Sequence, residues 1–291
     1  MTTLTAARST EPSPVLVMAR IEAGRLLRHP IFAVALALDA WLLVSSVMVD
    51  PEPNLQRMSE TWAILTAFCL GVGGFLAMYR VTRSTDASRE VVAAVPVDEQ
   101  QRTLALCLVC VIPLGVAVVS GLFTLIAWEP GPITEPGFYG RLPWADVWLF
   151  NVCVLLASLG GPLLGVTLGR WWSWPMAGAV SAVLLVAWCV STGFRTTSFV
   201  TTLHHQAAPF TLPITGASSE ETFRQGGSWW WRVPYVASLC ALAVIAALLH
   251  GATDHRRTLL LRTGTCVAVL AIVLLVVSTL TGPQGVLLWR A

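Results

Sequence analysis

The sequence predicts an all-α, polytopic membrane protein whose helices form one bundle. Hydrophobic residues make up 55% of the 291 residues, charged residues make up 12%, and the mean hydropathy is +0.71. Soluble domains carry about 25% charged residues, so this chain lies outside their range. Its apolar runs approach the roughly 20 residues that cross a bilayer. Backbone groups in lipid must be satisfied internally, so each run is predicted to be helical.

Seven runs are long enough to be spans, which leaves room for a single membrane domain. They are Ile31–Val49, Thr61–Tyr79, Leu104–Trp128, Trp144–Leu168, Trp172–Val190, Val233–Leu249 and Leu260–Thr279. Pro113 and Pro162 lie inside two of them and predict kinks or close contacts with neighbouring helices. Only Gly169–Trp171 separates the fourth and fifth spans, which predicts a tight antiparallel hairpin.

Arginine placement predicts the orientation. With the N-terminus in the cytosol, 12 of the 18 basic residues, all arginine, fall on the cytosolic side. This asymmetry obeys the positive-inside rule and leaves the C-terminus outside. We therefore divide the chain into a cytosolic N-terminus (1–30), one transmembrane domain (31–281) and a short extracytoplasmic tail (282–291).

The segment before the first span, Pro14–Arg28, has the pattern of an amphipathic helix. Ser13 can cap it, and Pro14 suits the first helical position. At about 100° per residue one arc is apolar, and the arginines lie off it. The arc consists of Val15, Leu16, Ala19, Ala23, Leu26 and Leu27. The pattern predicts a helix in the cytosolic membrane interface. An ordinary amphipathic helix packed on the protein is the alternative.

The cytosolic segment Arg80–Arg102 is predicted to contain a short coupling helix. Asp86 can cap it, with Glu90 in its first turns, where the helix dipole favours a negative charge. Val91, Val92 and Val95 then form an apolar face, and Pro96 ends the helix. Such a helix can dock into a groove on another protein. A solvated loop with one helical turn fits the pattern equally well.

Asp39 lies in the middle of the first span, where an ionised carboxylate costs roughly 2.5–3.5 kcal/mol. It should face the bundle, be protonated or meet a partner. The alternatives are a structural hydrogen bond to a neighbouring helix and a role in substrate passage. Six glycines in the spans permit close helix approach and predict packing or dimer contacts. They are Gly71, Gly73, Gly74, Gly160, Gly161 and Gly165.

The long connection Ser191–Trp231 is predicted to include a partial or re-entrant helix. Its pair His204 and His205 is a weak metal candidate, because zinc needs three or four ligands. Glu220 and Glu221 could complete a site, but we predict no metal.

The absence of lysine excludes a P-loop on this chain. The net charge of +2 does not indicate nucleic-acid binding, and no HExxH or GxSxG motif is present. The sequence therefore predicts no catalytic residues and no cofactor bound by this chain.

Three segments resemble one known family. They are ARIEAGRLLRHPIF (19–32), SREVVAAVPVDEQQRTLA (88–105) and WWWRVPYVASLCALAVIAALL (229–249). Their order and spacing are similar to the permease subunits of the second ABC exporter type, especially actinobacterial ones. Two features depart from that pattern. Many members have six spans rather than seven, and Ala87-Ser88 stands where a GT pair often precedes the acidic residue.

The resemblance implies a transporter subunit in a bacterial cell membrane, not an enzyme. Two permease chains, identical or different, would bind a cytosolic ATPase that carries ATP and magnesium. The residues implied in coupling are Arg89, Glu90, Val91, Val92, Val95, Pro96 and Arg102. The alternatives are a membrane-embedded enzyme using Asp39 or the histidine pair, and a non-transporting scaffold or sensor.

Overall fold

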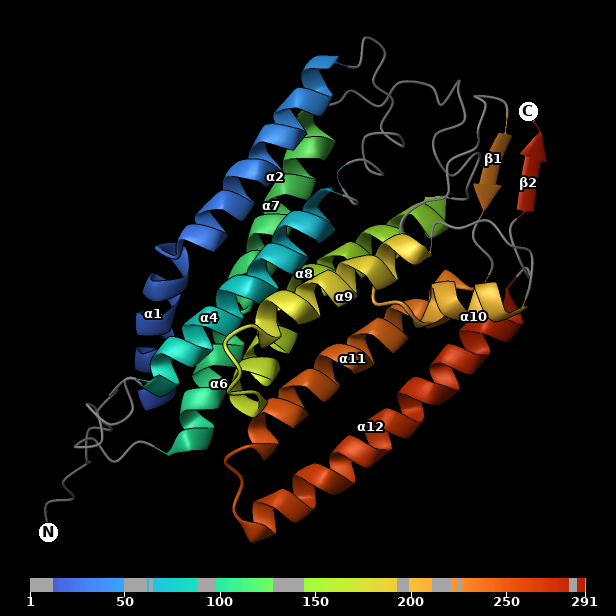
Figure 1. Ribbon diagram of the computed structural model, residues 1–291. Coiled ribbons are helices and arrows are strands. Elements are labelled where there is room, and N and C mark those ends of the chain that lie inside the picture. Colours follow the sequence, from blue (N-terminus) through green and yellow to red (C-terminus); the bar gives the residue numbers. More distant parts are fainter. Residues whose placement is uncertain are drawn as a thin grey trace, which may run out of the picture.

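The computed structural model describes residues 13–49, 62, 65–87, 98–127, 144–192, 199–210, 221–224, 227–282 and 287–290. Helices dominate these residues and lie side by side with similar inclination (Figure 1). In chain order the elements are α1 (Pro14–Leu27), α2 (Pro30–Val49), the π-helix η1 (Ala67–Val72), α4 (Gly73–Ala87), α6 (Glu99–Val109), α7 (Val111–Ala127), α8 (Trp144–Trp171), α9 (Ala177–Ser191), α10 (Phe199–Ala207), β1 (Glu221–Arg224), α11 (Trp229–Leu249), α12 (Asp254–Thr281) and β2 (Leu287–Arg290).

Long apolar helices confirm that the chain is a polytopic helical membrane protein. Within the described residues, four helices are long and apolar enough to cross a membrane: Glu99–Thr124, Trp148–Trp171, Trp229–Leu249 and Asp254–Thr281. A fifth crossing results if α1 and α2, which meet at a bend of 66°, count as one broken span. The helix α9 is apolar but shorter.

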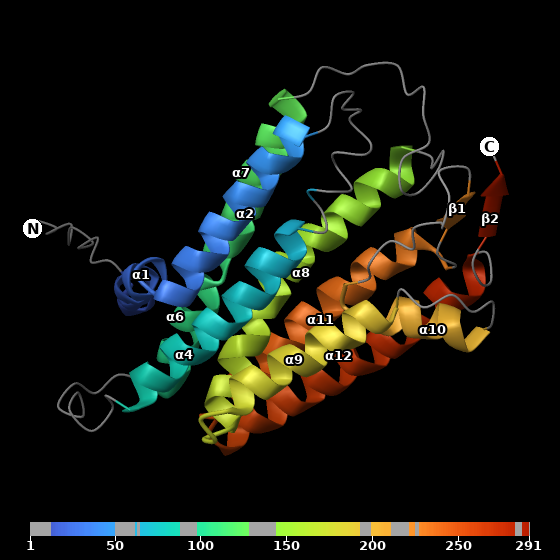
Figure 2. The same ribbon diagram turned by 45° about the horizontal axis from the view of Figure 1, so that its top comes forward.

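Helix α8 is the centre of the bundle, since it packs against η1, α4, α7, α9 and α11. Helices α2 and α12 lie at opposite edges (Figures 1 and 2). Near α1 the core contains Leu26, Phe32 and Leu106, whereas near α10 it contains Phe150 and Phe210.

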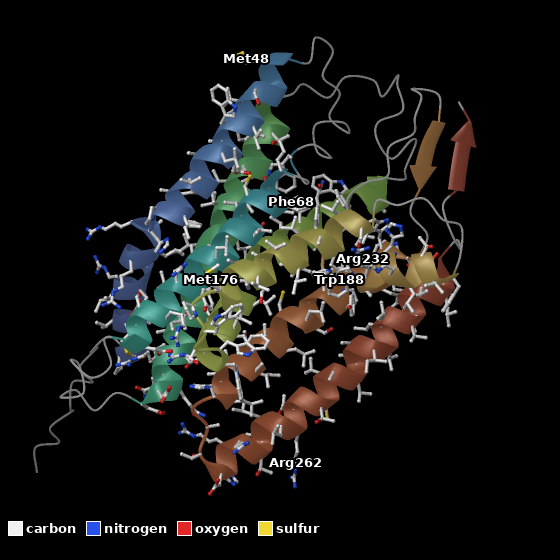
Figure 3. All side chains as sticks on the ribbon, viewed as in Figure 1. Met48, Phe68, Met176, Trp188, Arg232 and Arg262 are labelled. Atoms are coloured by element: carbon white, nitrogen blue, oxygen red, sulfur yellow. The ribbon has the colours of Figure 1, made fainter. Side chains whose placement is uncertain are left out.

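Many large apolar side chains point away from the core. Trp41, Val183 and Ile272 are well exposed on α2, α9 and α12, and the sticks in Figure 3 project outward along these helices. A surface of this kind suits lipid rather than water. Trp230 is also exposed, whereas Trp229 is buried in the core.

The predicted N-terminal helix is present as α1, and its apolar arc divides between the core and the outer surface. Leu26 packs into the core, with Ala19 and Ala23 packed against it, whereas Leu16 and Leu27 are exposed. The helix therefore carries apolar residues on its outward side as well. The core packing agrees with the alternative of a helix packed on the protein, and the position in the membrane interface stays a prediction.

Proline explains two helix boundaries. Pro113 cannot donate to the carbonyl of Val109, and the long helix is interrupted at Cys110, between α6 and α7. Pro175 precedes α9, which begins only at Ala177, while α8 continues to Trp171. The prediction that Gly169–Trp171 forms the turn is therefore wrong, because the connection is residues 172–176.

A two-stranded antiparallel sheet joins the C-terminal tail to the long connection before α11. Glu221 pairs with Arg290 and Arg224 pairs with Leu287. Neither strand was predicted from the sequence. The same connection contains α10, which agrees with the prediction of a partial helix there.

Candidate functional site

Arg170 is the centre of a charged junction at one end of the bundle, which we call the α4–α6 end. It lies in the last turn of α8, and its side chain is 0% exposed. Its Nη1 donates to Asp86 Oδ1 at 2.5 Å and lies 3.5 Å from Glu99 Oε1. Asp86 lies at the end of α4, and Glu99 begins α6. One buried guanidinium therefore holds the two helix ends that flank residues 88–97.

The predicted coupling residues Arg89, Glu90, Val91, Val92, Val95 and Pro96 lie outside the described residues. Arg102 is in α6, one turn after Glu99. From the sequence, Arg170 counted only toward the predicted orientation of the chain. The signal that could have found it is a cation directly after an apolar span, together with acidic residues on both sides of the coupling segment.

An ion pair within α1 contacts α4 at the same end through Thr85. Glu22 is buried and accepts from Arg25 Nη1 at 2.9 Å. Thr85, next to Asp86, places its Oγ1 3.3 Å from Glu22 Oε2 while it donates to the Val81 carbonyl at 2.9 Å. The N-terminal helix is therefore held to the last turn of α4.

A third contact joins α12 to the start of α6. Asp98 caps α6 by accepting from the Gln100 N–H at 3.2 Å. Arg256 Nη1 donates to Asp98 Oδ2 at 3.2 Å and to Gln100 Oε1 at 2.7 Å. This pair is exposed, so it contributes much less than the Arg170 junction. Together the three contacts bring α1, α8 and α12 onto the ends of α4 and α6.

Asp39 lies inside the bundle, where its residue is 3% exposed. Thr66 Oγ1 donates to Oδ1 at 2.9 Å, and Ser120 Oγ donates to Oδ2 at 3.0 Å. The carboxyl group thus links α2 to the start of η1 and to α7. This is the structural arrangement among the alternatives, and a role in substrate passage stays a prediction.

The six glycines all lie at helix contacts within the chain. A methyl group at Gly161 would collide with the carbonyl of Gly71, and one at Gly165 would collide with the carbonyl of Phe75. Gly74 faces Pro162 across the same interface of α8 with η1 and α4. The other two contacts join Gly73 to Ala35 and Gly160 to Cys240, on α2 and α11 respectively.

The opposite end of the bundle, the α10 end, is organised around a second buried arginine (Figure 3). Arg232 donates to the carbonyls of His205 and Ala208 at 2.9 and 3.0 Å. Its guanidinium also lies 4.9 Å from the ring centroid of Trp229. These contacts fasten α10 onto the start of α11.

The two histidines of α10 have different surroundings. His204 Nε2 lies 2.9 Å from Ser191 Oγ, whereas His205 is buried. Burial, with the charges of Arg232 and His204, lowers the pKa of His205 to about 4. In the described part of the chain, no three His, Cys, Asp or Glu side chains gather as metal ligands. Glu220 lies outside that part.

No family model, curated protein or solved structure matches this chain.

Proposed function

We propose that the chain is the membrane-spanning permease subunit of an ATP-driven exporter, and that a separate cytosolic ATPase acts on residues 88–97. The observation that carries this proposal is the Arg170 junction. A force that pulls on this segment reaches the ends of α4, α6 and α8 together, because one buried cation contacts both of its anchor points. Conformational energy reaches distant sites through such packed, two-state interfaces.

The proposal includes seven crossings. They are formed by α2, by η1 with α4, by α6 with α7, and by α8, α9, α11 and α12, with α1 in the membrane interface. The α4–α6 end then faces the cytosol, because Arg25, Arg80, Arg83, Arg170 and Arg256 gather there. The chain acts with a second permease chain, identical or different, in a bacterial cell membrane. ATP and magnesium bind to the ATPase.

Co-purification tests the proposal. The tagged chain, purified from its native membrane in mild detergent, should retain a protein with a nucleotide-binding site. The double variant Glu90→Arg with Val92→Asp should abolish retention, because it reverses the charge and breaks the apolar face of the predicted coupling helix. The control Glu52→Arg, in the connection predicted to lie outside, should retain the ATPase.

Retention of the ATPase by the Glu90 and Val92 double variant, with transport intact, would show that residues 88–97 are not the coupling segment. Catalytic activity of the purified chain alone, lost on His204→Ala, would favour the membrane-embedded enzyme.

A further inference from the structure

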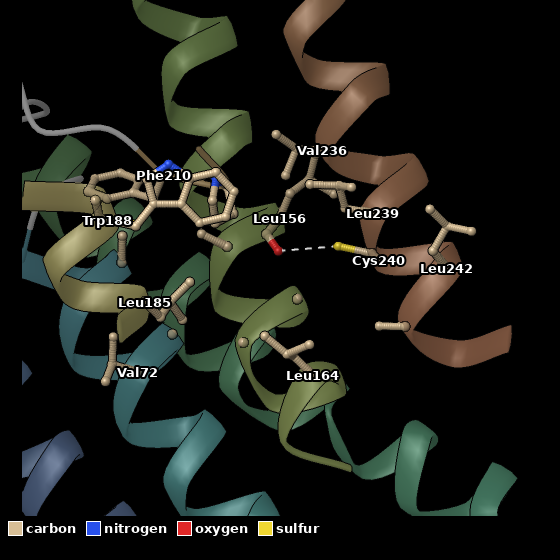
Figure 4. A pocket seen from close by; sticks show the side chains of 18 of the residues that line it. Val72, Leu156, Leu164, Leu185, Trp188, Phe210, Val236, Leu239, Cys240 and Leu242 are labelled. Atoms are coloured by element: carbon tan, nitrogen blue, oxygen red, sulfur yellow. Dashed lines mark hydrogen bonds between the residues drawn. The ribbon is translucent and has the colours of Figure 1, made fainter. Parts of the chain in front are cut away.

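A pocket of about 420 Å³ lies between α8, α9 and α11, beside the π-helix η1. Figure 4 shows its walls: Leu156 and Leu164 come from α8, Leu185 and Trp188 from α9, and Leu239 from α11. The volume lies in the range of about 300–1,000 Å³ that is typical of ligand pockets. Short π-helical turns often occur at functional sites, and η1 forms part of this wall.

The lining selects an apolar occupant. It consists mainly of aliphatic and aromatic side chains. Three of its hydroxyl and thiol donors are engaged with backbone carbonyls. Thr167 donates to Ala243 at 2.7 Å, Tyr235 donates to Ala207 at 2.9 Å, and the Cys240 thiol donates to Leu156 at 3.5 Å, the contact dashed in Figure 4. A polar solute would lose its hydration here with little to replace it.

The pocket is reached from the outer surface of the bundle. Trp188 and Leu164 line it and are 42% and 39% exposed. The surrounding surface of α9 is apolar, with Val183 68% exposed. In a polytopic membrane protein, an apolar surface along the middle of helices contacts the hydrocarbon of the bilayer. Apolar cavities exclude water, so the available occupant is hydrocarbon.

We infer that this pocket binds an acyl chain of a membrane phospholipid, inserted between α9 and α11 and packed against α8. The inference goes beyond the proposed exporter function and does not depend on it, because it follows from the lining and its exposure alone. The bound chain fills space that would otherwise leave the lining side chains without packing partners.

Photolabelling of the full-length chain tests the inference. The purified protein is placed in nanodiscs of phosphatidylethanolamine and phosphatidylglycerol that contain a phosphatidylglycerol with a diazirine at the end of one acyl chain. After irradiation, peptide mass spectrometry should find adducts on lining residues of α8, α9 and α11. Val186→Trp should reduce these adducts about tenfold. The larger side chain would occupy the space of the acyl chain, and packing both into the same pocket is strongly disfavoured.

Val183→Trp is the matched control, since Val183 lies on the same helix and points outward. It should leave labelling of the pocket unchanged. Leu239→Trp fills the pocket from α11 and should reproduce the loss if Val186→Trp does not fold. Two results would overturn the inference: labelling confined to outward faces, or equal labelling in all variants. No ATPase is present, so failure of the exporter proposal would not affect the result.

Discussion

Arg170 shows how strongly one buried cation can depend on its partners. Its side chain is fully buried beside Asp86 and Glu99, and these carboxylates come from different helices. Removing one partner of a buried ion pair leaves an uncompensated charge, which costs about 3–5 kcal/mol. The contact is therefore more important for the arrangement of the helix ends than the exposed pair of Arg256 and Asp98.

Arg170→Gln should lower the free energy of unfolding by about 3–5 kcal/mol, because Asp86 and Glu99 lose their shared cation. Unfolding in detergent, followed by circular dichroism, measures this change. Arg256→Gln is the control and should cost about 0.2–1 kcal/mol, since its pair is exposed. If both variants lower the free energy of unfolding by the same small amount, Arg170 does not hold the junction.

His205 makes the α10 end sensitive to acid. Its pKa is lowered to about 4 in the folded protein, mainly by burial, whereas an unperturbed histidine has a pKa near 6.5. Between these values the unfolded state binds a proton and the folded state does not, so stability falls as the pH falls from 6.5 towards 4. The effect is absent above pH 6.5.

Thermal unfolding of the purified protein between pH 7.5 and 4.5 should show a midpoint that decreases below pH 6.5. His205→Gln should weaken this decrease, because glutamine does not titrate. His204→Gln is the neighbouring control. If His205→Gln keeps the full decrease of the midpoint below pH 6.5, the pH dependence comes from another titratable group.

At the scale of elements, the contact of α8 with η1 and α4 depends on glycine. A methyl group at Gly161 meets the backbone carbonyl of Gly71, which cannot rotate away as a side chain could. Close backbone approach of this kind holds membrane helices together where lipid provides no hydrophobic driving force. Alanine at this position therefore requires the two helices to move apart.

Gly161→Ala should destabilise the protein by about 1–3 kcal/mol, the cost of overpacking a close contact. Gly115→Ala is the matched control, since nothing lies within 4 Å of a methyl group there. Alanine favours the helix more than glycine by up to about 1 kcal/mol, so this variant should be neutral or stabilising. Thermal unfolding in detergent compares the two variants. If Gly161→Ala is as stable as the unchanged protein, α8 and η1 lie further apart than the structure has them.

Elements differ in how well the sequence predicts them. Apolar runs predict the long helices, and Ser13 with Pro14 predicts the start of α1. Local patterns did not predict the end of α4, because Asp86 is held there by Arg170, which is 84 residues away in the sequence. The two strands were missed because their pairing joins Arg224 to Leu287, and a four-residue strand carries little pattern of its own.

The candidate site was predictable only in part. The sequence singled out Asp39 and the glycines, because a carboxylate or repeated glycine inside an apolar run is conspicuous by itself. It missed Glu22, Arg170 and Arg232, because a charged residue near a span end usually faces solvent or lipid headgroups. Their burial depends on which helices meet, and only the folded structure supplies that information.

At the scale of the whole molecule, the two ends of the bundle have different organisation. At the α4–α6 end, ion pairs connect α4, α6, α8 and α12 around the ends of residues 88–97, and hydrogen bonds of Thr85 join α1 to α4. At the α10 end, Arg232 holds a short helix through backbone carbonyls. A force on residues 88–97 therefore acts on several helices together, as the permease proposal requires.

The most direct test of this proposal is photocrosslinking in the native membrane with a photoreactive amino acid at position 92. We predict a product that joins this chain to an ATPase, identified by a P-loop sequence among the peptides of the attached protein, and no such product from position 54, in the connection predicted to lie outside. Products formed only with lipid or with this chain itself, or ATPase products from both positions, would contradict the permease proposal.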